Sequence, residues 1–371
     1  MANLTDLPNE LIDEIVALVY ATNPKQYLGA VHRLFVPSAR SLTFRHAEVT
    51  QCKCTPQALY AIVKKSYAVA TSVRSLTLGT IQAAEDSDPD VRQYGEEDCL
   101  PMSVHELDAL FIHLVNLEKL CVRSETLCDY VLNPNIPWAF RSLRSLAIRY
   151  GCRPERPNAF DPRRYTRMHE YPQLNTLELH FSPSFRSERA AYQPLLSQIC
   201  HGRTWNLLQA VPCPSKVRAI TLTTANALAS SDTLAVLVRF TSLSSLELGK
   251  ATFLPSHLSL LSRLPSLSRL VFGKDVELAV SDLVPLLPGP TKLPSLRHLR
   301  LDVVYEPFPG FVSLNPHAYY GWTPDFTMNG VGHLIDLAEK EDVELKGLAP
   351  ALLRRERHSE RMCCKPGGGR E

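Results

Sequence analysis

A short motif of alternating apolar and polar positions recurs eight times along the chain. In each copy two apolar residues flank one residue that is polar in five of the eight copies, and another apolar residue stands three positions before the pair. This alternation has the period of a β-strand with one buried face. The copies begin at Val73, Leu117, Leu143, Leu174, Val217, Leu243, Leu267 and Leu296.

Helix-like stretches lie between the strand motifs, which predicts an α/β solenoid with a parallel sheet on its concave side. Five of the seven spacings between copies are near the 20–29 residues of a leucine-rich repeat. The asparagine that usually follows each strand is missing, so we expect an irregular solenoid, over about residues 55–345. The predicted helical stretches are 103–115, 188–200, 231–240, 256–264 and 281–287.

The N-terminal residues predict a separate group of short helices. Pro8 suits the first helical position, and Glu10 in the first turn meets the positive end of the helix dipole. Further helical stretches follow at about 27–35 and 37–44. Three short helices within residues 1–48 bury too little apolar area to be stable alone, so they should lean on a partner or on the next domain. The apolar stripe of the first helix consists of Leu7, Leu11, Ile15 and Leu18.

Composition narrows the classes of partner. The chain of 371 residues has 40 Lys and Arg against 38 Asp and Glu, which favours neither nucleic acid nor a membrane surface. No stretch approaches the ~18 uninterrupted apolar residues of a spanning helix. The first residues lack a secretory pattern and the 10 cysteines form no C-x-x-C pair, so we expect a cytoplasmic or nuclear protein.

The N-terminal residues resemble the F-box family. The pattern Leu7-Pro8-x-Glu10-Leu11-x-x-x-Ile15-x-x-Leu18 matches the opening of that family's motif. The stretch Val31-His32-Arg33-Leu34-Phe35-x-Pro37 resembles its later part, especially in mushroom-type fungal proteins, although His32 departs from the family's cysteine. The resemblance implies docking on the Skp-type adaptor of a cullin-RING ubiquitin ligase, with Glu10 at the rim. The implied contacts are Leu7, Pro8, Glu10, Leu11, Ile15 and Val31.

Residues 55–345 resemble the leucine-rich-repeat domain of F-box proteins, and residues 346–371 form a basic tail that we expect to be disordered. The combined resemblance implies a substrate-recognition subunit of a Skp–cullin–F-box ubiquitin ligase that binds an unidentified target protein. One alternative is a repeat scaffold without ligase association, whose N-terminal helices only cap the first repeat. Another is an enzyme with an unrecognised site.

Strand alternation predicts where a target would bind. The outward side chains of the strands form columns that mix small residues with isolated charges, which suits a protein surface. No stripe of one charge runs along them, so nucleic acid fits poorly. The central column is Thr77, Cys121, Ala147, Glu178, Thr221, Glu247, Val271 and Arg300. The candidate target-binding residues are Glu178, Glu247, Arg300, Arg123, Arg149 and His180.

Catalytic motifs are missing from the sequence. No G-x-S-x-G elbow, H-E-x-x-H helix, Walker-type loop or G-x-G-x-x-G turn occurs. The 12 histidines are dispersed and none stands at ligand spacing from a cysteine or a pair of carboxylates. We therefore expect no catalytic site, no metal site and no cofactor, and a role that depends on holding proteins in proximity.

Overall fold

The computed structural model of the chain describes fifteen stretches of residues, which contain all the helices and strands given below. They divide between two compact units, Met1–Tyr150 with Tyr165–Leu174 and Gly151–Arg164 with Asn175–Glu371. The described residues are 9–22, 44–49, 56–79, 104–123, 125–132, 136–152, 171–183, 202, 204–211, 213–223, 235–252, 260–277, 283–287, 292–302 and 328–347.

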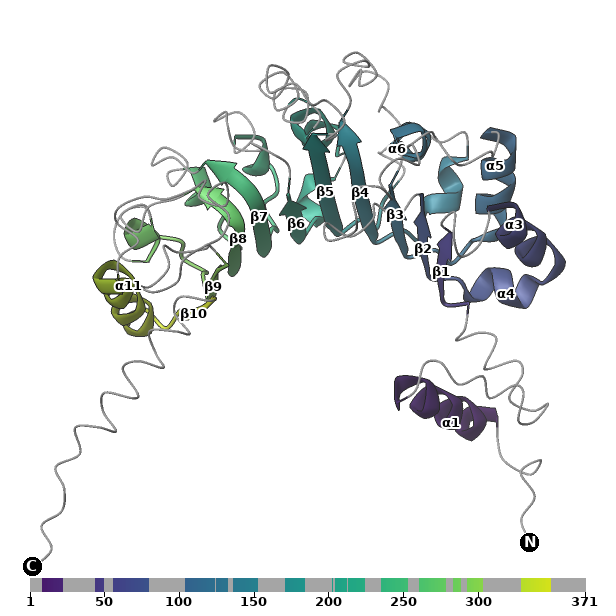
Figure 1. Cartoon of the computed structure of the whole chain (residues 1–371), viewed down its shortest axis with the longest axis horizontal. Helices are drawn as coiled ribbons and strands as arrows, with labels where there is room; N and C mark the ends of the chain where they lie inside the picture. Colours follow the sequence, from purple (N-terminus) through teal and green to yellow (C-terminus); the bar gives the residue numbers. More distant parts are fainter. Residues whose placement is uncertain are drawn as a thin grey trace, which may run out of the picture. The chain divides into compact units, whose positions relative to one another are not determined.

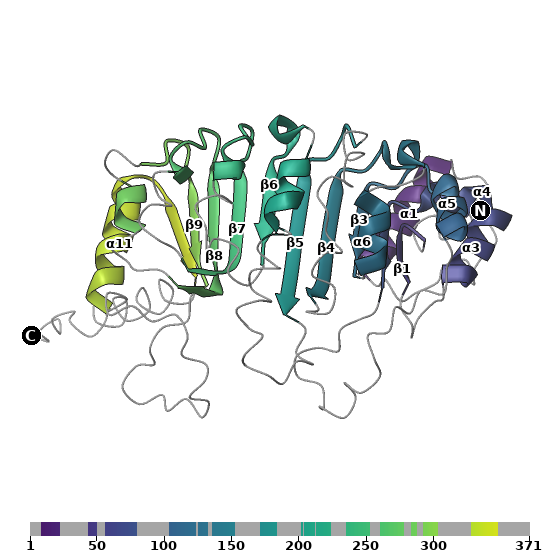
Figure 2. The same cartoon turned by 90° about the horizontal axis from the view of Figure 1, so that it is seen from above.

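The first unit contains four parallel strands that pair in sequence order (Figure 1). They are β1 (His46–Val49), β2 (Ser75–Leu78), β3 (Lys119–Val122) and β4 (Ser145–Cys152). Helices α5 and α6 lie on one face of this sheet in both views (Figures 1 and 2). The helical elements are α1 (Asn9–Thr22), α3 (Pro56–Lys65), α4 (Tyr67–Ser72), α5 (Val104–His113), α6 (Glu125–Leu132) and the 3-10 turn η5 (Pro137–Phe140).

The second unit repeats the same plan with mostly shorter connections. Its strands are β5 (Thr176–Pro183), β6 (Ala219–Leu222), β7 (Ser245–Thr252), β8 (Arg269–Glu277), β9 (His298–Leu301) and β10 (Glu344–Gly347). They also pair parallel and in sequence order. The 3-10 turns are η9 (Pro214–Lys216) and η10 (Val284–Leu286), and helix α11 (Met328–Lys340) packs against β10.

All eight predicted strand motifs are strands, and the parallel α/β repeat is confirmed within each unit. Within each unit, the second apolar position of a copy is in register with the same position of the next copy, for example Leu76 with Leu120 and Leu246 with Leu270. These side chains are at most 1% exposed and form the core. Burial of a leucine contributes about 1.5–3 kcal/mol, so the repeated motif supplies much of the stability.

Where the structure describes their C-terminal ends, the predicted helices end one to three residues earlier than the sequence suggests. Stretch 103–115 is confirmed as α5, whereas 188–200 lies outside the described residues. Described helical residues reach only 235–237 in the third stretch and 260–261 in the fourth, and the fifth holds the 3-10 turn η10. Pro288 follows η10 in the sequence and disfavours a helical residue before it, which explains the early end.

Two strands were not predicted. The segment Phe44-Arg45-His46-Ala47-Glu48-Val49 has the same spacing as the eight copies, with the small Ala47 at the second apolar position, and it contains β1. Phe44 falls in a stretch that the sequence predicts as an N-terminal helix. Our boundary at residue 48 falls inside this strand. In β10 the leading apolar position is taken by Asp342, which adopts a left-handed φ of 57°. The pattern of leading apolar residues therefore did not reveal either strand.

An aromatic layer fills the interior of the first unit. The ring of Phe111 lies 5.8 Å from that of Tyr130 and 4.8 Å from that of Phe140, whose ring is 5.4 Å from Tyr171. The hydroxyl of Tyr171 donates a hydrogen bond to the carbonyl of Val131. Burial, and then the hydrogen bond to Asp108, raise the pKa of Tyr130 far above its usual value. The layer joins three successive connections of the repeat.

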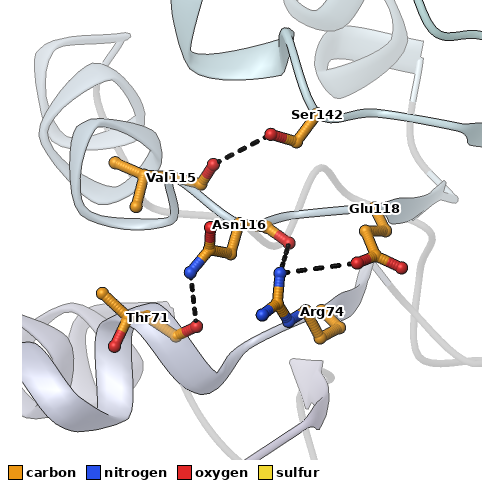
Figure 3. A network of polar contacts seen from close by, with 6 residues as sticks. All are labelled: Thr71, Arg74, Val115, Asn116, Glu118 and Ser142. Carbon is orange, nitrogen blue, oxygen red and sulfur yellow. Dashed lines mark hydrogen bonds and ion pairs between the residues drawn. The ribbon is translucent and has the colours of Figure 1, made fainter.

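Side chains just before the strands stitch neighbouring repeats together. In the first unit Asn116 Nδ2 donates a hydrogen bond to the Thr71 carbonyl at 2.9 Å (Figure 3). One repeat later, Ser142 Oγ donates to the Val115 carbonyl at 3.2 Å (Figure 3). Each donor stands one residue before the leading apolar residue of its repeat, and each acceptor stands two residues before that of the preceding repeat.

The same arrangement recurs in the second unit. Ser266 Oγ donates to the Thr241 carbonyl at 3.0 Å, and Ser295 Oγ donates to the Pro265 carbonyl at 2.6 Å. The donors and acceptors occupy the same motif positions as in the first unit. A polar ladder therefore precedes the strands, in a chain that lacks the usual asparagine after them. It satisfies carbonyl groups that a regular helix would otherwise pair.

Candidate functional site

Helix α1 divides its apolar residues into a buried and an exposed set. Ile12 and Val16 are 4% and 0% exposed, whereas Leu11, Ile15 and Leu18 are 44%, 40% and 67% exposed. The exposed residues are four and three positions apart, so they form one row along the helix. We call Leu11, Ile15 and Leu18 the exposed row of α1. A row of exposed large apolar side chains is typical of a binding face.

The other predicted adaptor contacts are placed less completely. Glu10 lies in the first turn of α1, as the sequence predicts. Leu7, Pro8 and Val31 lie outside the described residues. The structure therefore brings together Leu11 and Ile15, two residues of the predicted set, on one exposed row.

The sheet of the first unit carries the predicted column in register. Thr77, Cys121 and Ala147 are successive partners on β2, β3 and β4. Two residues after this column, Arg123 is half-buried just beyond β3 and Arg149 is exposed in β4. The two arginines thus stand at equivalent positions of neighbouring strands.

Gly79 makes room for Arg123 at the end of β2. Its φ is 122°, and a Cβ built on it would lie 2.8 Å from the Cβ of Arg123. The backbone N–H of Arg123 donates a hydrogen bond to the Leu78 carbonyl at 2.9 Å. Only glycine accepts both the left-handed conformation and this close approach.

In the second unit the register confirms the central column and extends it. Glu178, Thr221, Glu247, Val271 and Arg300 are successive partners on β5 to β9, followed by Lys346 on β10. Sequence reasoning missed Lys346 because β10 lacks the leading apolar residue of the motif. Its alternation, Glu-Leu-Lys next to a helix, is the signal that points to it.

Two positions of the predicted column are buried rather than solvated. Ala147 is 9% exposed and Val271 is 3% exposed. Alternation gives the direction of a side chain but not what surrounds it, so the sequence could not separate these positions from their neighbours. The polar members of the column that stand next to Val271 in register are Glu247 and Arg300.

His180 lies at the closely packed margin of this face. Its Nδ1 is 2.5 Å from Oγ1 of Thr223, which directly follows β6. A Cβ built on Gly249 would lie 2.3 Å from Cγ2 of Thr223, and one built on Gly273 would lie 2.9 Å from the Gly249 backbone. The backbones of β6, β7 and β8 therefore approach one another closely here, and His180 borders them.

Charged side chains gather over β9 and β10. Arg300 Nε is 2.8 Å from a carboxylate oxygen of Asp302. Glu344 pairs with both His298 at 2.8 Å and Lys346 at 2.7 Å. The hydrogen bond that Arg300 donates to Asp302 raises the pKa of Arg300, and the hydrogen bonds from Lys346 and His298 lower the pKa of Glu344. Arg300 and Glu344 therefore keep their charges at neutral pH.

Within the described stretches, no group of three or more His, Cys, Asp or Glu side chains is arranged to hold a metal ion. No helix among the same residues is both long enough and apolar enough to cross a membrane. The residues that the structure brings together are the exposed row of α1, the two arginines Arg123 and Arg149 of the first unit, and the charged column of the second unit.

Comparison with known proteins gives distant structural neighbours. No protein-family model matches the chain, and no curated protein sequence matches it. An internalin, InlF of Listeria monocytogenes str. 4b F2365, aligns over 70% of this chain and 54% of its own, with 12% identity and a TM-score of 0.30. A TLR13 chain solved with ssRNA13 aligns over 72% of this chain and 41% of its own, with 14% identity and a TM-score of 0.29.

Both neighbours are leucine-rich-repeat proteins, and this chain spans about half the length of each. Because both TM-scores are below 0.5, we base the repeat fold on the ladders of this chain. The eight motifs in common register, the parallel pairing and the buried leucines establish it.

Proposed function

We propose that the chain is a substrate-recognition subunit of a Skp–cullin–F-box ubiquitin ligase. The observation that carries the proposal is the exposed row of α1, which lies in the segment that resembles the F-box motif. Full burial of one exposed leucine or isoleucine contributes about 1.5–3 kcal/mol, so the row can anchor a small interface. Ile12 and Val16, about 110° around the helix from this row, are buried.

In this proposal the two parts of the chain have different partners. The exposed row of α1 binds the Skp-type adaptor, and the polar face of the repeat sheets binds the target protein. Other subunits transfer ubiquitin to lysines of the target. This chain contributes orientation, because holding two reactants close raises their effective concentration.

Adaptor binding tests the proposal directly. Purified full-length chain and a Skp-type adaptor are mixed, and the affinity is measured by calorimetry or by co-purification. We expect the double substitution Leu11→Asp with Ile15→Asp to abolish binding, because a carboxylate in an apolar contact is costly to desolvate. Both side chains are exposed, so α1 should remain folded.

Ala17→Asp is the matched control on the same helix. Ala17 is exposed and stands two residues from Ile15, about 200° around the helix, so it lies outside the row. We expect this variant to bind the adaptor like the unaltered chain. Failure of the unaltered chain to bind, or equal binding by the double variant, would contradict the proposal.

A deletion separates this function from that of a scaffold whose terminal helices only cap the first repeat. The deletion should end at residue 43, because removal of residues 1–48 also removes most of β1 from the sheet. We expect the chain without residues 1–43 to lose the adaptor and keep its melting temperature. A large fall in melting temperature without any adaptor binding by the full chain would favour the cap.

A further inference from the structure

The sheet face of the second unit changes the sign of its charge from one side to the other. Glu178 on β5 and Glu247 on β7 are acidic, and Arg300 on β9 and Lys346 on β10 are basic. All four belong to the same column, and adjacent strands are about 4.8 Å apart. Glu178, Glu247 and Arg300 therefore follow one another at intervals of about 10 Å, with one uncharged strand position in each interval.

The carboxylate of Glu247 is available to accept hydrogen bonds. Its side chain is half-buried, and within the described part of the chain its carboxylate accepts no hydrogen bond and joins no ion pair. An ionised carboxylate can accept about four hydrogen bonds. A basic side chain of a partner protein would supply the donors that Glu247 lacks.

Arg300 is held in place by a neighbour that leaves most of its donors available. Asp302 accepts a hydrogen bond from Nε at 2.9 Å. Among the described residues no partner is bonded to the two terminal nitrogens of the guanidinium. Those nitrogens can bind a carboxylate in a bidentate manner, and Asp302 acts as a positioning residue for them.

We propose that this face binds an extended protein segment that carries a basic side chain opposite Glu247 and an acidic side chain opposite Arg300. The proposal rests on the proposed function, since such a segment would belong to the ligase target. An extended chain advances about 3.3 Å per residue, so an interval of about 10 Å corresponds to three residues. The segment has the pattern basic-x-x-acidic, and a further basic residue three positions from the first, on the side away from the acidic residue, lies opposite Glu178.

Labelled synthetic peptides test the pattern on the full-length chain. Each peptide has a Gly/Ser background with one Lys and one Glu, in both orders, separated by one to eight positions. Binding is measured by fluorescence anisotropy at low ionic strength, where surface charges are little screened. We expect the tightest binding at a separation of three, weakened about five- to tenfold at one or at eight.

Charge reversal should change the preference in a defined way. Glu247→Lys should prefer a Glu-x-x-Glu peptide, and Arg300→Glu should prefer Lys-x-x-Lys, each by about five- to tenfold over Lys-x-x-Glu. Arg263→Glu is the matched control, because it makes the same change of charge at an exposed turn between β7 and β8. It should keep the preference of the unaltered chain. Unchanged circular dichroism and melting temperature establish that each variant is folded.

Asp302→Asn tests the positioning role. Loss of the ion pair should weaken binding of Lys-x-x-Glu, while binding of a peptide that carries the Lys alone, which makes no use of Arg300, stays the same. Arg300→Lys keeps the charge but loses the bidentate geometry, so it should bind Lys-x-x-Glu more weakly than the unaltered chain.

Equal binding of all charge patterns, no binding of Lys-x-x-Glu at millimolar concentration, or no change of preference in the two reversals would overturn the inference. The adaptor experiment is independent of these measurements. A chain that binds the adaptor but shows no peptide preference retains the ligase proposal and loses this inference. A chain that shows the peptide preference but does not bind the adaptor retains this inference about the sheet face and loses the ligase proposal.

Discussion

The two units build the same repeat with different surfaces. The structure describes eight exposed large apolar side chains, and all of them belong to the first unit. Three form the exposed row of α1, and the others are Ile62, Tyr67, Ile112, Val115 and Trp138. The sheet of the second unit instead carries charged pairs on β9 and β10 and two carboxylates on β5 and β7.

In the proposed function, this difference corresponds to two kinds of recognition on one scaffold. Burial of exposed apolar side chains against almost any complementary apolar surface is favourable, which suits a partner common to many chains. Charges contribute little affinity when exposed but discriminate strongly against the wrong partner. The first unit is therefore suited to a constant partner and the second to a selected one.

The interior of the first unit gives the largest expected effect. Phe140 is fully buried between Phe111 and Tyr171, so Phe140→Ala should lower the free energy of unfolding by about 3–5 kcal/mol. Because repeats are stabilised mainly by their neighbours, amide hydrogen exchange should rise more in β3 and β4 than in β9. Phe140→Leu is the control and should cost clearly less. An equal rise in both units would show that they unfold as one.

A pair of glycines, one in each unit, should respond very differently to alanine. Gly79→Ala would hold an alanine at a left-handed φ of 122° and press its Cβ against Arg123. It should therefore lower the free energy of unfolding by about 1–3 kcal/mol, measured by chemical denaturation. A Cβ on Gly202 meets nothing within 4 Å, and Gly202→Ala should be nearly neutral. If Gly79→Ala were equally neutral, the close approach of β2 and β3 at this point would be wrong.

Much of the fold could be predicted, because leucines recur at the positions whose side chains are buried in the core. The eight motifs gave strands in the right register, and alternation placed Glu247 and Arg300 on one face. Strand β1 was missed because its segment begins at Phe44, which lies in a predicted N-terminal helix, and β10 was missed because Asp342 takes the leading apolar position. The ion pair between Asp302 and Arg300 could not be predicted, and neither could the burial of Val271. Both depend on neighbouring side chains, which the pattern of residues along the chain does not specify.

Removal of a hydrogen bond of the polar ladder before the strands should cost less stability than the changes above. The loss should be larger in the first unit than in the second. Asn116→Ala removes a part-buried hydrogen bond to Thr71 and should cost about 1 kcal/mol. Ser266→Ala removes the equivalent bond to Thr241, which is exposed to water and should cost less. Denaturant titration of the two variants measures the difference. Asn116→Asp, which cannot donate this bond, should resemble Asn116→Ala, and a stability like that of the unaltered chain would exclude the ladder.

The exposed pairs of the second unit predict the smallest effect, and it depends on pH. Hydrogen bonds from Lys346 and then His298 lower the pKa of Glu344 in the folded chain. Stability from this pairing is therefore fully present above the pKa of an unfolded glutamate, near 4.3, and is lost as pH falls through the lower folded value. Lys346→Met should lower the melting temperature slightly at pH 7, and the difference should shrink as pH falls from about 5 toward 3.

Lys119→Met provides the comparison in the first unit. Lys119 is also an exposed strand lysine, but within the described residues its side chain joins no ion pair. Its substitution should give a difference in melting temperature that varies little over the same pH range. Added salt should reduce the effect at Lys346, because the pair is exposed and screened. A difference at Lys346 that persists at pH 3 would place its contribution in apolar packing of the lysine stem, and the charged column of the second unit would then act only on bound partners.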